Sequence, residues 1–124
     1  MKIYISLPIS GREKKARERA EKIAQALEKL GHTPVNPFDI YAGENPDYFD
    51  HLCADLRAMV DCDAVYFDKG YYKSCGCCIE GDVIWRLMQH DKKFIKKIYG
   101  DIDFNVFLED ENLPLLKKLK ELGI

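Results

Sequence analysis

Two acidic residues occupy positions where a helix would turn them toward its apolar side. Glu80 comes early in a predicted helix and shares one face of it with Val83, Ile84 and Leu87. Asp55 lies at the edge of the apolar stripe of an earlier helix. Two carboxylates that converge on one cleft suit a reaction with an oxocarbenium-like transition state. One acts as nucleophile or charge stabiliser, and the other moves a proton.

Each acid also has a plainer interpretation. A helix N-terminus favours an acidic side chain, which explains the position of Glu80 along its helix but not the face on which it lies. A carboxylate on a buried face is costly unless it is paired or needed. Asp55, taken alone, suits a solvated residue at the boundary of its helix. The residues by themselves leave open whether the two carboxylates converge.

Two turns rich in small residues precede predicted helices. The first, SLPISG, contains Ser6, Pro8, Ser10 and Gly11. The second contains Ser74 and Gly76. Backbone N–H groups at such helix starts can hold an anion such as a phosphate, and hydroxyls can bind a sugar. Neither turn is a GxGxxG motif or a P-loop. Ordinary turn and capping chemistry is the alternative for both.

The cysteines favour packing over metal binding. Cys75, Cys77 and Cys78 cluster tightly, but a zinc site needs a second ligand pair at a suitable spacing. Cys53 and Cys62 do not form such a pair. We therefore expect small buried cysteines and no metal, with a reactive thiol at a helix N-terminus as the alternative.

Strands and helices alternate along the chain. Strands are predicted at 2–7, 32–35, 64–67 and 94–99, with 105–108 as a candidate fifth. Helices are predicted at 12–30, at 46–60 after an Asn45 cap with Pro46 at the first position, at 76–90 and at 113–122. This order predicts one α/β domain over residues 1–124, with a Rossmann-like or flavodoxin-like parallel sheet of four to five strands flanked by helices. Ligands bind at the carboxyl ends of such strands, which here are the loops 8–11, 36–45 and 68–75.

Composition excludes several classes of protein. The net charge of −2 over 124 residues is unlike that of proteins that bind nucleic-acid polymers. No apolar run is long enough for a membrane span, and the first residues do not resemble a signal peptide. Five cysteines, an odd number, argue against a disulfide framework and favour the reducing cytoplasm.

Three stretches together resemble the nucleoside 2-deoxyribosyltransferase-like superfamily, which includes nucleoside 5′-monophosphate N-glycosidases. They are IYISLPISG at 3–11, DLRAMVDCDAVYF at 55–67 and SCGCCIEG at 74–81. The first is similar to the first strand and small-residue loop of that superfamily. The second and third match its spacings for an active-site Asp and a catalytic Glu. The resemblance covers most of residues 2–88, and nothing after residue 100 is assigned by it.

The resemblance implies roles for individual residues. Glu80 would be the nucleophile at the anomeric carbon, and Asp55 would assist departure or protonation of the base. Tyr4 would lie near the sugar, and Ser10 with Gly11 would form the phosphate loop. Ser74 stands where the monophosphate glycosidases carry Ser, which favours a 5′-phosphorylated substrate. The resemblance also implies that no organic cofactor is needed, and that homodimers or larger oligomers complete each site.

Two functions remain after this comparison. The first is cleavage or transfer of the N-glycosidic bond of a nucleoside or its 5′-monophosphate. The second is a module that binds or senses a nucleotide in the same pocket without turnover. Leu7, which stands where a small residue is common, favours the second, and the pair of Asp55 and Glu80 favours the first. A purely structural domain is a third and weaker reading.

Overall fold

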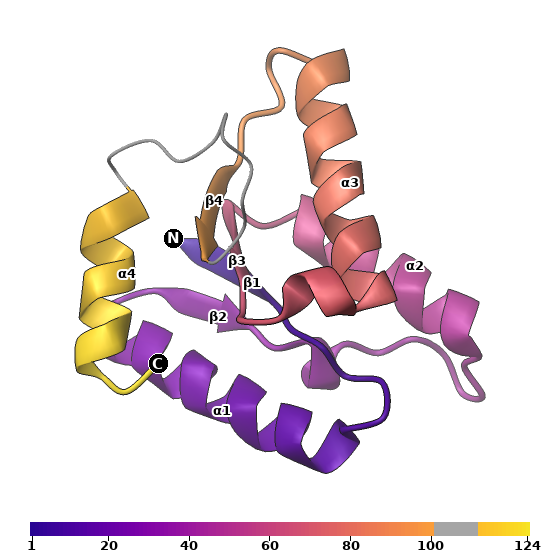
Figure 1. The fold of residues 1–124 in the computed structure, drawn as a ribbon. Helices are drawn as coiled ribbons and strands as arrows, with labels where there is room; N and C mark the ends of the chain where they lie inside the picture. Colours follow the sequence, from indigo (N-terminus) through magenta and orange to yellow (C-terminus); the bar gives the residue numbers. More distant parts are fainter. Residues whose placement is uncertain (101–111) are drawn as a thin grey trace.

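The computed structural model describes residues 1–100 and 112–124 and shows an α/β fold of the Rossmann or flavodoxin type. Its sheet has four parallel strands in the order β2-β1-β3-β4 (Figure 1). The strands are β1 (Lys2–Ser6), β2 (Thr33–Val35), β3 (Ala64–Phe67) and β4 (Lys97–Gly100). The parallel α/β fold predicted from the alternating pattern is therefore confirmed.

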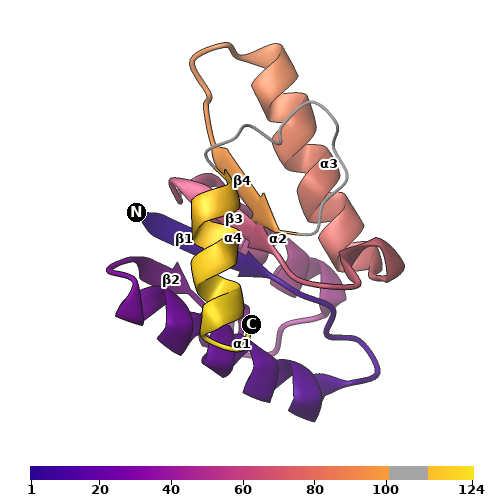
Figure 2. The ribbon, with the colours of Figure 1, turned by 60° about the vertical axis from the view of Figure 1, so that its left-hand side comes forward.

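Helices cover both faces of the sheet. Figures 1 and 2 show α1 (Glu13–Lys29) and α4 (Asn112–Glu121) on one face, with α2 (Tyr48–Val60) and α3 (Cys75–His90) on the other. Alternate residues of β1 serve the two faces, as the pleat of a strand requires. Ile3 and Ile5 belong to the core under α1 and α4. Tyr4 belongs to the core under α2 and α3.

The start of α2 differs from the expectation. The helix begins at Tyr48, and its cap is Asp47 rather than Asn45. The Asp47 carboxylate accepts a hydrogen bond from the Asp50 N–H at 2.7 Å, and the Asp50 carboxylate accepts one from the Asp47 N–H at 3.0 Å. This reciprocal capping box satisfies two N–H groups that a cap at Asn45 would leave open.

Other boundaries shift for local reasons. The strand predicted at 94–99 is observed at Lys97–Gly100, because Asp91 closes a turn that includes the Phe94 N–H. The predicted strand 105–108 lies outside the described residues. Phe49 and Cys53 of α2 are exposed.

Candidate functional site

Glu80 lies on the face of α3 that meets the sheet, as its helical phase predicts, and only 7% of it is exposed. Ser6, the last residue of β1, donates a hydrogen bond to Glu80 Oε1 at 3.5 Å. The hydroxyl of Tyr4, two residues earlier on the same strand face, is a further hydrogen-bond partner of this carboxyl. Glu80 Oε2 is buried and has no hydrogen-bond partner among the described residues. One oxygen of the carboxyl is thus held by β1 and the other is left open.

This environment raises the pKa of Glu80 to about 8. Burial is the largest cause, because a low-dielectric surrounding disfavours the charged form. The negative charge of Asp55 raises it further, while the hydrogen bonds from Tyr4 and Ser6 oppose the rise. Burial is also the main reason why the pKa of the Tyr4 hydroxyl lies well above its ordinary value, and the negative charges of Glu80 and Asp55 raise it further. The Tyr4 hydroxyl therefore stays a hydrogen-bond donor.

Asp55 approaches the same place from α2. It is half-buried in the second turn of that helix, and its charge acts on both Tyr4 and Glu80. Burial raises the pKa of Asp55 to about 6, against a smaller lowering by His51. Two like-charged carboxyls in one partly dry region cannot both ionise freely. The structure therefore brings together the two acids that the sequence singled out.

Ser74 and Gly76, at the start of α3, connect this helix to the start of α2. Ser74 caps the helix, and its Oγ accepts a hydrogen bond from the Cys77 N–H at 3.3 Å. Gly76 lies beneath Tyr48 of α2, since a Cβ atom there would lie 3.8 Å from the Tyr48 hydroxyl oxygen. The starts of α2 and α3 are therefore in contact next to the carboxyl pair. The capping interpretation of Ser74 is confirmed, and its binding role remains a prediction.

The loop after β1 is less closely tied to this pair. Pro8 lies beside the loop that follows β3, because a Cβ atom on Gly70 would lie 4.0 Å from Pro8 Cγ. Ser10 and Gly11 form an exposed turn, and the Gly11 N–H donates to Glu13 Oε1 at 3.3 Å. The Glu13 carboxylate thus already accepts the hydrogen bond of the Gly11 N–H, a group that we expected to bind a phosphate. The anion-binding role of this loop remains a prediction.

Cys77 is a member of the site that the sequence analysis did not place there, because it favoured packing for the cysteines, with a reactive thiol as the alternative. It is buried and hydrogen-bonds with Ser6 and Ser74, and the charge of Glu80 influences the pKa of its thiol. Burial raises the pKa of its thiol, with the two serine hydrogen bonds opposing the rise. The signal that could have found it is its spacing of three residues from Glu80, which puts both side chains on one helix face.

The other cysteines of this cluster depart from the expectation of burial. Cys75 and Cys78 are exposed, and the Cys78 thiol donates to the carbonyls of Tyr71 and Tyr72 at 3.7 and 3.6 Å. The reason is that consecutive residues at a helix start point in different directions, so only Cys77 can face the sheet.

A comparison with known families places these elements. The family described as a domain of unknown function (DUF4406) matches residues 1–91. The chain belongs to this family. The DUF4406 match includes β1, α2 and α3, and so every residue of the candidate site, whereas β4 and α4 lie beyond it. A search of curated proteins finds none that matches the chain. Within the described parts of the chain, no helix has both the length and the apolar character of a membrane span.

Proposed function

We propose that the chain cleaves or transfers the N-glycosidic bond of a nucleoside or nucleoside 5′-monophosphate, as its resemblance to the nucleoside 2-deoxyribosyltransferase-like superfamily implies. One observation carries the proposal. The Glu80 carboxyl is buried, has one oxygen without a partner among the described residues, and lies within the field of a second carboxyl. Such an arrangement costs stability, so a function that needs it is a better explanation than packing.

The chemistry follows from the two carboxyls. Glu80 Oε2 attacks the anomeric carbon as the bond to the base breaks, and the bonding electron pair leaves with the base. Asp55 gives a proton to the departing base. Water or a second base then attacks the sugar carbon, the bond to the Glu80 carboxylate breaks, and the proton of the attacking group passes to Asp55, which completes hydrolysis or transfer. Ser6 holds Oε1 of Glu80 and Tyr4 also hydrogen-bonds to this carboxyl, so both residues of β1 orient it toward the sugar.

A sensing module without turnover is the second candidate, and one observation favours it. A pKa of about 8 keeps Glu80 mostly protonated at neutral pH. A neutral carboxylic acid donates a hydrogen bond to a ligand but is a poor nucleophile. The glycosidic chemistry instead needs an ionised Glu80 together with a protonated Asp55. At neutral pH this is the minority form of the pair.

Release of free base decides between these candidates. The protein would be incubated with a panel of nucleosides and 5′-monophosphates, with and without a second acceptor base, and the products separated by chromatography. We expect release that Glu80→Gln abolishes. Asp82→Asn is the matched control, because Asp82 lies on the same helix, is exposed and pairs only with Arg86 in the described structure.

The outcomes separate the two functions. Dependence of release on the acceptor base would indicate transfer, and its absence hydrolysis. If no substrate releases base while a nucleotide still raises the melting temperature, the enzyme proposal is wrong and the sensing module replaces it. A nucleotide at 100 times its dissociation constant would stabilise the fold by about 2.7 kcal/mol, which is readily measured.

A further inference from the structure

A cavity of about 390 Å³ lies on the other face of the sheet from Glu80. It is a half-open cavity between α4 and the carboxyl ends of β3 and β4, and the described residues that line it are Tyr66, Lys69, Gly100, Leu116, Leu119, Lys120 and Ile124. Small-molecule sites occupy roughly 300–1,000 Å³ and combine apolar walls with a few polar groups. The cavity has the size and the mixed lining of such a site.

Its charged side chains are of one sign. Among the described residues that line it, Lys69 and Lys120 are cationic and none is acidic. Lys69 Nζ donates to the main-chain oxygen of Ile124 at 3.0 Å, which uses one of its three N–H donors, and Arg19 donates to the same oxygen at 3.4 Å. The Lys120 side chain is exposed and has no hydrogen bond or ion pair within the described parts of the chain. The cavity therefore offers several unused cationic donors.

Asp68, a buried acid that directly precedes the lining residue Lys69, is paired with Arg19. Asp68 is buried directly after β3, and Arg19 of α1 holds both of its oxygens at 2.8 and 2.9 Å. Tyr66, which lines the cavity, also donates to Asp68 Oδ1 at 3.2 Å. Arg19 cancels the charge of Asp68 and fixes the Tyr66 hydroxyl in place. Among the described residues that line the cavity, the two lysines therefore have no competing carboxylate side chain.

We propose that this cavity binds a small amphipathic anion, whose apolar body lies against Leu116, Leu119 and Ile124 and whose carboxylate or phosphate lies between Lys69 and Lys120. The site is separate from the Glu80 region, because α1 and α4 cover one face of the sheet and α2 and α3 the other (Figure 2). It also depends on α4, which lies beyond the DUF4406 match. The proposal is independent of any glycosidic activity.

Calorimetric titration of the intact protein with octanoate tests this proposal. Octyl phosphate tests the second headgroup, and octylammonium supplies the same apolar body with the opposite charge. We expect both anions to bind and the cation not to bind. Amide signals of Gly100, Leu116 and Leu119 in a nuclear magnetic resonance spectrum should shift with octanoate, which places the ligand in the cavity. Failure of both anions to bind would overturn the proposal.

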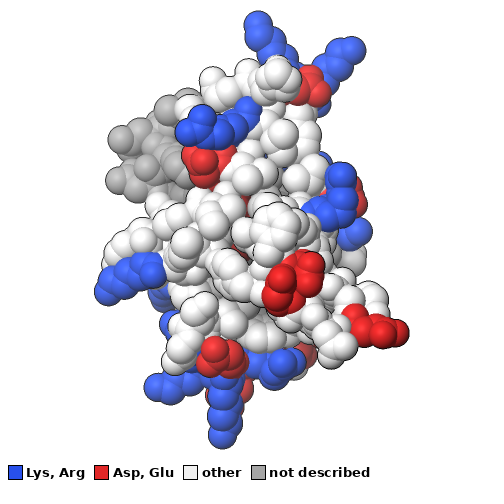
Figure 3. Space-filling model, turned by 90° about the vertical axis from the view of Figure 1, so that its right-hand side faces the viewer, with Lys and Arg blue, Asp and Glu red and all other residues white. Residues whose placement is uncertain are grey.

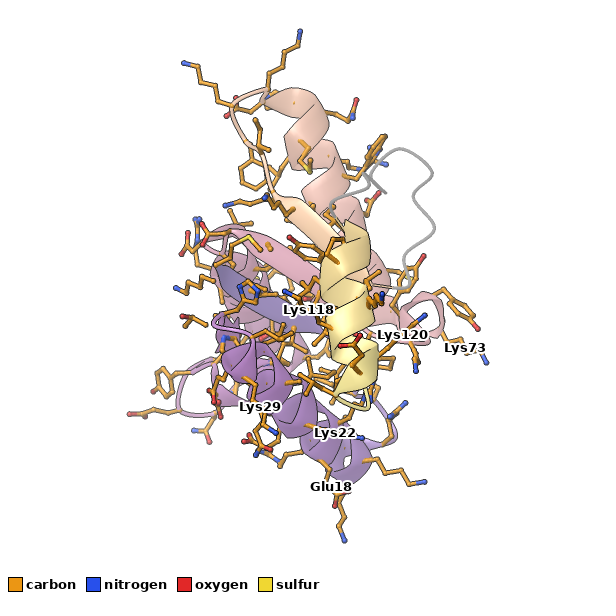
Figure 4. The ribbon with its side chains drawn as sticks, turned by 90° about the vertical axis from the view of Figure 1, so that its left-hand side faces the viewer. Glu18, Lys22, Lys29, Lys73, Lys118 and Lys120 are labelled. Carbon is orange, nitrogen blue, oxygen red and sulfur yellow. The ribbon has the colours of Figure 1, made fainter. Side chains whose placement is uncertain are left out.

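A pair of charge reversals on α4 tests the role of the cations. Lys118 and Lys120 lie on opposite sides of this helix, and only Lys120 lines the cavity (Figure 4). Lys120→Glu should weaken octanoate binding about tenfold, because it replaces an attraction by a repulsion. Lys118→Glu, which makes the same change in net charge, should leave the affinity unchanged. Equal affinities for the two variants would overturn the proposal.

A variant that fills the cavity provides a second test of the proposed site. Leu116 is partly buried at the cavity wall, and Leu116→Trp should occupy the space that the apolar body needs. We expect the folded variant to lose octanoate binding while it retains the circular dichroism spectrum of the parent. Undiminished binding by this folded variant would place the ligand elsewhere and refute the proposed site. The Lys120→Glu comparison changes only an exposed residue and does not depend on this variant.

Discussion

At the scale of single residues, Glu80 and Asp55 titrate at different pH values. The pKa values of about 8 and about 6 mean that the pair holds one proton over the pH range between them. The dominant form has the proton on Glu80, whereas the proposed chemistry needs it on Asp55. The fraction of this reactive form is constant between the two pKa values and falls outside them.

We therefore predict a bell-shaped pH dependence of kcat/KM, with limbs near pH 6 and pH 8. The rate falls below pH 6 because both carboxyls are protonated, and above pH 8 because both are ionised. Initial rates of base release over pH 5–9 test this. A profile that only rises through pH 8 would show that Asp55 acts as a carboxylate and not as the acid.

The same raised pKa predicts how stability changes with pH. The folded state binds the Glu80 proton up to a pKa of about 8, whereas the unfolded chain releases it near 4.5. The contribution of Glu80 to the free energy of unfolding is therefore fully present below pH 4.5. It falls by about 4–5 kcal/mol as the pH rises to 8. Asp55 adds a smaller loss in the same direction between about pH 4 and 6.

Glu80→Gln should remove the Glu80 part of this loss. We expect the variant to match the parent in denaturant unfolding near pH 4.5 and to exceed its stability at pH 8. The shallower loss from Asp55 should remain. Parallel stability curves for the two proteins across this range would contradict the buried, protonated state of Glu80.

The sequence predicted part of this site. The helical period put Glu80 on the buried face of its helix, and the structure confirms that face. Its contact with Ser6, which is 74 residues away, depends on how α3 crosses β1, and no local pattern encodes that crossing. The half-burial of Asp55 likewise arises only when α2 packs in the fold, whereas the influence of His51 is local, because His51 lies four residues earlier on the same helix.

At the scale of elements, the start of α2 depends on Asp47. Asn45, Asp47 and the intervening Pro46 are all favourable near a helix start, so composition alone did not separate the candidate caps. The reciprocal bonds between Asp47 and Asp50 decide the position. Asp47→Ala should lower stability by about 1 kcal/mol, because the Asp50 N–H at the helix start loses the carboxylate that accepts its hydrogen bond.

Thermal unfolding of Asp47→Ala and Asp47→Asn checks this prediction. The Asn side chain retains an acceptor oxygen, so this variant should lose much less than the Ala variant. Equal losses in the two variants would mean that the charge of Asp47, and not the capping geometry, stabilises the helix.

The end of β4 depends on a glycine. Gly100 has a φ of +112°, and a Cβ atom there would lie 2.0 Å from the Phe67 carbonyl oxygen of β3. Gly43 has a φ of +114° with nothing within 4 Å of the same position. The two glycines thus share a backbone conformation but differ in the space around it.

Gly43→Ala should cost about 1–2 kcal/mol, the expense of a side chain at positive φ. Gly100→Ala should cost about 4 kcal/mol or more, because the clash adds to the same strain and is with backbone. Denaturant unfolding of both variants gives the difference. Equal costs would show that β4 moves away from β3 without penalty.

At the scale of the whole molecule, the alternation of strands and helices predicted the parallel sheet, and the structure confirms it. The place of α4 was not predicted. Its amphipathic pattern predicts that one face of the helix is buried, but it does not indicate which elements that face packs against. In the structure Leu115 and Leu119 join the core beneath α1, which completes this face of the sheet and creates the cavity.

The surface around the candidate site is rich in exposed aromatic side chains. Tyr48 and Phe49 begin α2 and are 59% and 67% exposed, and Tyr72, just before α3, is 62% exposed. Uncharged surface extends over much of the middle of the face that bears α2 and α3 (Figure 3). Large exposed aromatic side chains are enriched at protein interfaces. We therefore predict that the chain forms a homodimer through this surface.

Sedimentation velocity at micromolar concentrations tests the predicted dimer. Phe49→Ser should weaken it by about tenfold or more, because aromatic anchors contribute a large share of interface energy. Ile95→Ser is the matched control, since Ile95 is 75% exposed and lies in the connection between α3 and β4, away from the helix starts. A monomeric parent protein would contradict the prediction, and equal weakening by both variants would place the interface elsewhere. A dimer lost only with Phe49→Ser would bring a second copy to the helix starts that adjoin Asp55 and Glu80, and base release should then fall with dilution.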